Sequence, residues 1–271
     1  MWGNCAIITL WNPPPFVIED LREGLAYLPK HEVYVEGVDM SKKSTKQATP
    51  SNALIAQMRN RGSVRSSIWH VYSLKANNDL ILESHREVAH WLIYLEFVPS
   101  IVAFWKPQGE EFNADQRGGR KVKLDAIATN VEGLIEWHEV KPGYIDDLEA
   151  HEQLKVQKEL AQAAGALYRL FDESTRDARH YQVMPLLRLA SFVALTRWSV
   201  DINATEALLF QTVGLNRTGT IGSLAQILPN LDMTELVGGL SRLAIKGQVE
   251  LTIDAFTPNL QTTWSCKVER P

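Results

Sequence analysis

The clearest helical period in the chain lies in residues 81–97, "ILESHREVAHWLIYLEF". Four apolar residues there fall at the spacing of one helix face: Val88, Trp91, Leu92 and Leu95. Ser84 stands just before this pattern and has the side chain of a good N-cap. A second helical pattern covers residues 146–165 and closes on Gly165, a residue type that favours helix C-termini. We therefore predict a helix at each place, the first with one buried stripe.

Alternating patterns predict a set of short strands around these helices. The strand segments are 67–74, 101–107, 120–129, 133–141 and 166–171, with a turn after the first at 75–79. The order helix, three strands, helix, strand is that of an α/β domain with a mixed sheet. This is the fold class we expect up to about residue 174.

The pattern becomes mainly helical after residue 175. Helices are predicted at 184–198 and 203–213, then two helices and a strand within 220–256, and a final strand at 260–268. Two short helices followed by a β-hairpin are typical of winged helix-turn-helix domains. The expected organisation is an N-terminal extension of unknown role (1–40), an α/β domain (41–174) and a winged-helix-like domain (175–271).

Composition places the chain among soluble globular proteins. It has 271 residues, of which 45% are hydrophobic and 22% charged, and its two cysteines, Cys5 and Cys266, lie at opposite ends. The most apolar run is interrupted by His90, Glu96 and Pro99, which is wrong for a membrane span. The N-terminus lacks the pattern of a signal peptide, so we expect a cytoplasmic protein.

Positive charge is concentrated in two places although the net charge is −4. Residues 41–66 contain six cations and no acid, and residues 117–123 contain four more cations. Either run can be a solvated loop, but two runs flanking acidic residues favour contact with DNA phosphates. The candidate DNA-binding residues are Arg59, Arg61, Arg65, Arg120, Lys121 and Lys123.

The C-terminal domain has no such excess. Residues 185–271 carry seven cations and seven acids, and the second helix of the predicted helix pair offers only Arg242 and Lys246. These numbers favour a domain that docks to protein over one that reads a DNA sequence, although both remain open.

Four residues of the α/β domain form a candidate catalytic set. Glu139 and Lys141 alternate around Val140 and so share one face of a strand. Asp125 lies in the preceding strand, where a lone acid is costly unless it is paired or binds a metal, and neighbouring strands would bring it to that pair. Glu87 lies beside the apolar stripe of the first helix. Three carboxylates with one lysine suit Mg²⁺ or Mn²⁺.

Each of these residues also has a simpler interpretation. Ser84 and Glu87 match a capping box, S-x-x-E, and Glu83 is a rival for the acid contributed by the helix. Glu139 and Lys141 alone would be taken as a surface ion pair. His138 alternates to the face opposite Glu139, so it is expected to be packed or exposed and not to be catalytic.

The order of these motifs resembles the PD-(D/E)XK nucleases, in which a helical Glu precedes a strand Asp and then Glu-x-Lys. It resembles more specifically TnsA, the endonuclease subunit of heteromeric cut-and-paste transposases. The segments that carry the resemblance are "RNRGSVRSS", "ESHREVAHWLIYLEF", "VAFWKPQ", "KLDAIA", "HEVKP", "EQLKVQKE" and "ALYRLF", over residues 55–175. Two features depart from the pattern: Leu124 replaces the superfamily's proline, and residues 1–40 have no counterpart in the family. Glu139 matches the acid of the wider superfamily, at a position where TnsA relatives can carry glutamine.

The resemblance implies a restriction-endonuclease-like fold for residues 41–174 and places the catalytic set on Glu87, Asp125, Glu139 and Lys141. The three acids would bind Mg²⁺, for which Mn²⁺ substitutes, and Lys141 would orient the attacking water. It also implies cleavage of the 5′ strands at transposon ends, with a DDE transposase (TnsB-like) as partner. An AAA+ ATPase regulator (TnsC-like) would contact the C-terminal region, and the assembled complex would lie on the bacterial nucleoid. The alternatives are a restriction-type or junction-cleaving nuclease and a non-catalytic DNA-binding assembly protein.

Overall fold

The computed structural model describes residues 67–107, 112–113, 121–141, 148–173, 175 and 178–268. The expected N-terminal extension, 1–40, lies outside these residues, as does the start of the α/β domain. Among the described helices, none is long and apolar enough to cross a membrane.

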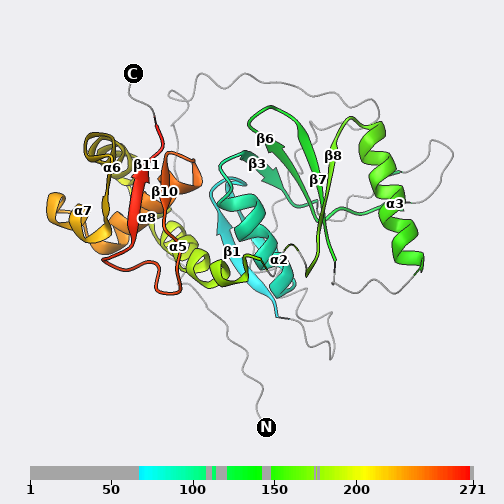
Figure 1. Cartoon of the computed structure of the whole chain (residues 1–271), viewed down its shortest axis with the longest axis horizontal. Helices are drawn as coiled ribbons and strands as arrows, with labels where there is room; N and C mark the ends of the chain where they lie inside the picture. The colour runs from blue at the N-terminus through cyan, green and yellow to red at the C-terminus, as the bar shows by residue number, and fades with distance from the viewer. Residues whose placement is uncertain are drawn as a thin grey trace, which may run out of the picture. The chain divides into compact units, whose positions relative to one another are not determined.

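A mixed four-stranded sheet forms the centre of the α/β region (Figure 1). Its strands in spatial order are β3 (Ile101–Trp105), β6 (Ala126–Asn130), β7 (Ile135–Val140) and β8 (Leu167–Phe171). β6 pairs antiparallel with both β3 and β7, whereas β7 and β8 run parallel. Helix α3 (Leu148–Ala163) makes the crossover between the two parallel strands, and Gly165 follows it with a φ of +69°. The predicted mixed α/β sheet and the glycine after the helix are confirmed.

The two faces of the sheet bury different residues because side chains alternate along each strand. Ile127 and Trp137 pack with Ala161 of α3, whereas Ala126 and Ala128 belong to the core that includes the first helix. This arrangement places α3 and the first helix on opposite faces of the sheet.

The first helix, α2 (His85–His90), begins at the predicted N-cap, since Ser84 Oγ accepts a hydrogen bond from the Glu87 N–H at 3.1 Å. It continues into a π-helical segment, η1 (Trp91–Glu96). The four residues of the predicted stripe are all buried. At the end of η1, the buried Glu96 carboxylate accepts hydrogen bonds from Ser73 Oγ at 2.5 Å, Leu74 N at 2.7 Å and Trp91 Nε1 at 3.0 Å.

Two boundaries differ from the sequence predictions. Residues 81 and 82 belong to a strand, β2 (Asn78–Leu82), which pairs antiparallel with β1 (Trp69–Ser73) and buries Leu80 and Leu82. Cross-strand pairing therefore overrides the local helical period there. The predicted strand 120–129 is divided into two strands, β5 (Lys121–Val122) and β6. β5 pairs with β4 (Phe112–Asn113). Asp125 lies just before β6 and not inside a strand.

The C-terminal part contains helices and a small sheet. The helices are η2 (His180–Gln182), α5 (Val183–Thr196), α6 (Ile202–Asn216), α7 (Ile221–Ile227) and α8 (Met233–Ile245). The antiparallel sheet has the order β10 (Val249–Leu251), β11 (Thr263–Cys266), β9 (Thr218–Thr220). The first two form the predicted hairpin, and the three-residue β9 was not predicted because so short a segment has no readable alternation.

Helix α8 is enclosed by its neighbours. Residues 236–245 are all buried, and the helix packs mainly against α5 and α6. Glycines allow the close approach, because a Cβ at Gly238 would lie 3.0 Å from the Phe192 carbonyl oxygen of α5 and a Cβ at Gly239 would lie 2.5 Å from Leu209 of α6. One hydrophobic cluster contains residues of α2, η1, α5 and α8, so buried contacts continue across the boundary expected near residue 174.

Candidate functional site

Asp125 lies at the start of β6, against the end of β7. Its backbone N–H donates to the His138 carbonyl at 3.2 Å, and its Oδ2 accepts a hydrogen bond from the Val140 N–H at 2.7 Å. Burial raises the pKa of Asp125, and the nearby Glu87 carboxylate raises it further, while the Val140 hydrogen bond and two lysines oppose the change. The backbone of β7 thus fixes this carboxylate directly, as the predicted neighbouring of the two strands requires.

Glu139 and Lys141 form an ion pair with 2.7 Å between Glu139 Oε1 and Lys141 Nζ. The prediction that they share a face of the strand is confirmed, but the pair is not at the surface, since Glu139 is 4% exposed. Its Oε2 is buried and has no hydrogen-bond partner among the described residues. Burial, and then the charge of Asp125, raise the pKa of Glu139 to about 7 despite the Lys141 ammonium.

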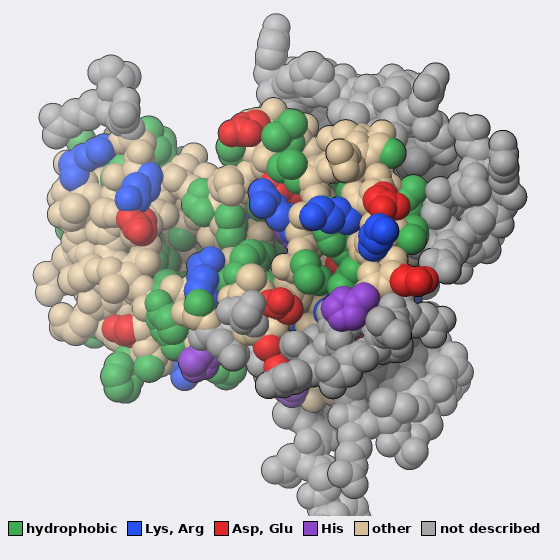
Figure 2. All heavy atoms as spheres, turned by 45° about the vertical axis from the view of Figure 1, so that its right-hand side comes forward, with side chains coloured by type: hydrophobic (Ala, Val, Ile, Leu, Met, Phe, Trp, Pro, Cys, Tyr) green, Lys and Arg blue, Asp and Glu red, His purple; other side chains and the backbone are tan. Residues whose placement is uncertain are grey.

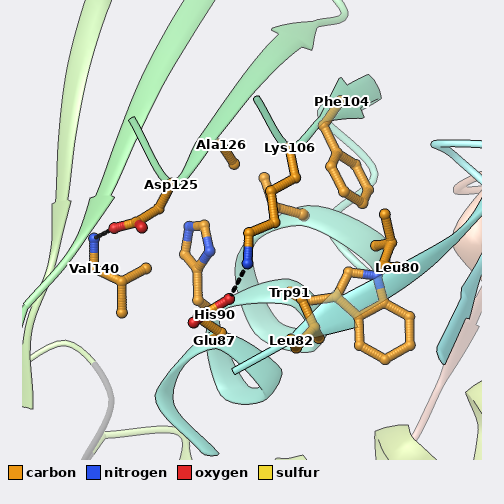
Figure 3. A pocket seen from close by; sticks show the side chains of 11 residues that line it. Leu80, Leu82, Glu87, His90, Trp91, Phe104, Lys106, Asp125, Ala126 and Val140 are labelled. Atoms are coloured by element: carbon orange, nitrogen blue, oxygen red, sulfur yellow. Dashed lines mark hydrogen bonds and ion pairs between the residues drawn. The ribbon is translucent and has the colours of Figure 1, made fainter. Parts of the chain in front are cut away.

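Glu87 reaches the same region from α2, where its carboxylate forms an ion pair with Lys106. Lys106 follows β3 and also donates from Nζ to the Ile81 carbonyl at 3.2 Å. Glu87, Lys106 and Asp125 line one pocket, together with His90 and apolar side chains (Figure 3). The rival acid Glu83 is not among the residues that line it. Of the alternative capping box, the half at Ser84 is present, but the partner described for the Glu87 carboxylate is Lys106.

A chain of polar groups leads from this pocket along one face of the sheet, since His138 and Glu136 are two residues apart on β7. His90 Nε2 lies 2.9 Å from His138 Nδ1, and His138 Nε2 lies 3.3 Å from Glu136 Oε2. Glu136 in turn accepts from Arg169 Nε at 3.2 Å. Burial lowers the pKa of His138 to about 4 and holds that of His90 well below its ordinary range, so both imidazoles are neutral at pH 7. His138 is therefore packed, one of the two possibilities that its position in the strand left open.

The donor set fits a hard divalent cation. Two adjoining carboxylates, Asp125 and Glu139, are partly or fully buried with raised pKa values, and one buried oxygen of Glu139 has no described partner. A cation beside them would compensate the charge that burial disfavours. With the side chains as they stand, however, the described residues contain no group of three His, Cys, Asp or Glu that could hold a metal ion. Glu87 and Glu139 each have a lysine as partner instead.

Most of the predicted DNA-binding residues lie outside the described part of the chain. Arg59, Arg61, Arg65 and Arg120 are in that group, and only the backbone of Lys121 is described, on β5. Lys123 is exposed, and its carbonyl accepts from Gln157 Nε2 at 3.2 Å. On the face in Figure 2, the described Lys and Arg side chains are interspersed with Asp and Glu. Contact with DNA through these cations stays a prediction.

The second helix of the predicted pair is α8. Its two cations, Arg242 and Lys246, both form ion pairs with Glu206 of α6. Arg242 Nε lies 2.7 Å from Glu206 Oε2, and the Lys246 ammonium pairs with the other oxygen. Burial acts to raise the pKa of Glu206, but these two cations hold it below its ordinary value. With residues 236–245 buried, α8 has no basic face available to a DNA groove.

Sequence reasoning missed three side chains of this region: Lys106, His90 and Gln157. Lys106 had a signal, because it is a single cation that directly follows an apolar strand and precedes Pro107. His90 also had one, since it lies three residues after Glu87, on the same side of a helix. Gln157 is fully buried on α3 and accepts from Tyr168 Oη at 2.7 Å, which no periodicity of the charged helix indicates.

Comparison with known proteins adds no relative: no protein-family model matches the chain, and no curated protein matches it significantly.

Proposed function

We propose that this protein is a metal-dependent DNA endonuclease of the PD-(D/E)XK type, resembling TnsA. The observation that carries the proposal is the meeting of Asp125, Glu139 and Lys141 at adjoining ends of β6 and β7, with Glu87 of α2 lining the same pocket as Asp125. Their order along the chain and their placement on a helix and two neighbouring strands both fit such a nuclease.

The acids would hold the metal and the lysine would act on water. Asp125 and Glu139 would be ligands, with Glu87 as a further one, and Lys141 would orient the attacking water and offset charge on the phosphate. A bound Mg²⁺, or Mn²⁺ in its place, supplies Lewis acidity toward the phosphate and makes water more acidic. Hydrolysis would then leave a 5′-phosphate and a 3′-hydroxyl.

The raised pKa values support a site built for a cation. The carboxylates of Asp125 and Glu139 repel each other and are partly removed from water, and both effects lower the stability of the folded protein. Such perturbed groups gather at functional sites, because the binding of a ligand recovers the cost.

The TnsA resemblance extends the proposal to transposition. The chain would cut the 5′ strands at transposon ends beside a DDE transposase, in the bacterial cytoplasm and on the nucleoid. The C-terminal helices with the β10–β11–β9 sheet suit a winged-helix domain. Because α8 is buried and its cations are paired with Glu206, docking to a protein such as an AAA+ regulator is favoured over sequence reading.

The test is Mn²⁺ binding by calorimetry to the full chain, since this needs no partner. We expect binding to wild type, loss of binding in Asp125→Ala, and no change in the control Asp201→Ala, an exposed acid on the C-terminal side of the chain. Thermal unfolding would show that both variants are folded. Equal Mn²⁺ binding by wild type and Asp125→Ala would remove the central residue of the proposal. Cleavage of transposon-end DNA, with the partner transposase added, would then test the activity itself.

A further inference from the structure

Lys106 is the one charged group of the pocket that the nuclease pattern does not assign. We infer that Lys106 is a positioning residue that holds Glu87 in the absence of metal, so that a divalent cation has to displace its ammonium group to gain Glu87 as a ligand. The inference rests on the proposed function, because it concerns the same site.

The contacts of Lys106 are specific. Its ammonium pairs with Glu87 Oε2 and also donates to the Ile81 carbonyl at 3.2 Å, so it bridges α2 and β2 in the lining of the pocket. The side chains of Lys106 and Glu87 are 27% and 18% exposed, which leaves the amine a path to water. The backbone of Lys106 is restricted by Pro107, so the amine's position is set by the end of β3 and by its own flexible stem.

Fold stability does not account for the ion pair. The N-terminus of α2 is already capped by Ser84, whose hydroxyl accepts from the Glu87 backbone, so the Glu87 carboxylate is not required as a cap. Partly buried ion pairs add little net stability because both ions lose hydration. The position of the pair beside Asp125 is therefore better explained by the site than by the fold.

The two lysines of the site differ in what they hold. Lys141 pairs with Glu139 on the side of the sheet that α3 covers, and the Glu-x-Lys pattern assigns it to water. Lys106 pairs with the acid on the α2 side, and Asp125 lines the same pocket with its carboxylate turned toward Val140 (Figure 3). With Glu87 held by Lys106, the described side chains bring no three potential ligands together, and release of Glu87 is the rearrangement that would add one.

Removal of the Lys106 amine should therefore strengthen metal binding. A variant that is merely unfolded or distorted would instead bind the metal less tightly. A unit positive charge a few ångströms from a divalent cation opposes binding, so Lys106→Met is expected to bind Mn²⁺ about tenfold more tightly than wild type. Lys106→Gln, which keeps a hydrogen-bond donor toward Glu87 without the charge, should also bind more tightly. Lys106→Arg keeps the cation and should return the affinity to near the wild-type value.

The experiment is Mn²⁺ calorimetry on the full chain with these three variants. Lys267→Met is the matched control, because it also removes a lysine paired with a glutamate, Glu250, but in the C-terminal sheet. Lys267→Met should bind Mn²⁺ as wild type does. Thermal unfolding identifies any variant that does not fold, in which case Lys106→Gln replaces Lys106→Met.

The outcomes separate this inference from the proposed function. Unchanged, weaker or absent Mn²⁺ binding in folded Lys106→Met and Lys106→Gln would overturn the inference. If Asp125→Ala still loses the metal in that case, the proposed function stands and Lys106 acts elsewhere, for example on a DNA phosphate. Equal binding by wild type and Asp125→Ala would overturn the proposed function and this inference with it.

Discussion

Replacement of Glu139 by glutamine should stabilise the protein while it weakens metal binding. Glu139 is buried, its Oε2 has no described hydrogen-bond partner, and burial with the neighbouring Asp125 raises its pKa to about 7. An amide of the same shape removes the charge. The Lys141 side chain that loses its partner is 21% exposed and can turn its amine to water.

The magnitude follows from the pKa of Glu139. A rise from 4.5 to about 7 corresponds to about 3 kcal/mol of cost when the carboxylate is fully ionised. The folded protein binds this proton more tightly than the unfolded chain does, so unfolding releases a proton between these pH values, and stability falls as the pH rises through them. The stabilisation by Glu139→Gln should therefore be near zero at pH 4.5 and reach about 3 kcal/mol at pH 8.

The assay is urea unfolding of wild type and Glu139→Gln at several pH values from 4.5 to 8. The difference between the two proteins isolates Glu139 from other titrating groups. Glu159→Gln is the control, since Glu159 is an exposed acid of α3 paired with Lys155, and its difference from wild type should stay small at every pH. If Glu139 is a metal ligand as proposed, added Mn²⁺ should raise the stability of wild type at pH 8 more than that of Glu139→Gln.

Two results would contradict a buried, poorly compensated carboxylate at Glu139. A Glu139→Gln protein that is less stable than wild type at pH 8 would show that the carboxylate is well solvated or bonded by residues outside the described part. A stability difference that does not change with pH would show that the pKa of Glu139 is not raised.

Two further substitutions test the packing around the site. Gly238→Ala should destabilise the protein by about 2–3 kcal/mol, because its Cβ would lie 2.6 Å from Thr196 Cγ2 and force α5 and α8 apart. Its control is Gly214→Ala on α6, where no atom lies within 4 Å and alanine should stabilise by about 1 kcal/mol; equal urea midpoints for the two variants would contradict the contact. Glu96→Gln should cost about 2–4 kcal/mol, because its carboxylate accepts three hydrogen bonds that one amide oxygen and an NH₂ group cannot replace. A Glu96→Gln midpoint at or above that of wild type would show that charge burial outweighs those bonds.

Glu96 and Glu139 illustrate why burial of an acid alone predicts little. Both carboxyls are buried and have raised pKa values. Three donors surround Glu96, whereas one oxygen of Glu139 has no described partner. This difference in hydrogen bonding is not visible in the sequence, because donors to Glu96 come from residues as far as 23 positions away.

Local chemistry in the sequence determined several parts of this protein. Ser84 as N-cap, the buried stripe that begins at Val88, Gly165 after α3, and Glu139 beside Lys141 all depend on neighbours within one or two turns or along one strand. Such features follow from backbone geometry and side-chain period, which act over a few residues. The mixed sheet followed from the order of these elements.

Other parts were decided only by tertiary contacts. Pairing with β1 makes residues 78–82 a strand although the helical pattern overlaps their end. The packing of α5 and α6 around α8 buries the helix that the sequence offered for DNA reading. Lys106 becomes the partner of Glu87 because β3 ends beside α2. In each case the contacting residue is distant in sequence, so the contact contributes free energy only after the chain has folded.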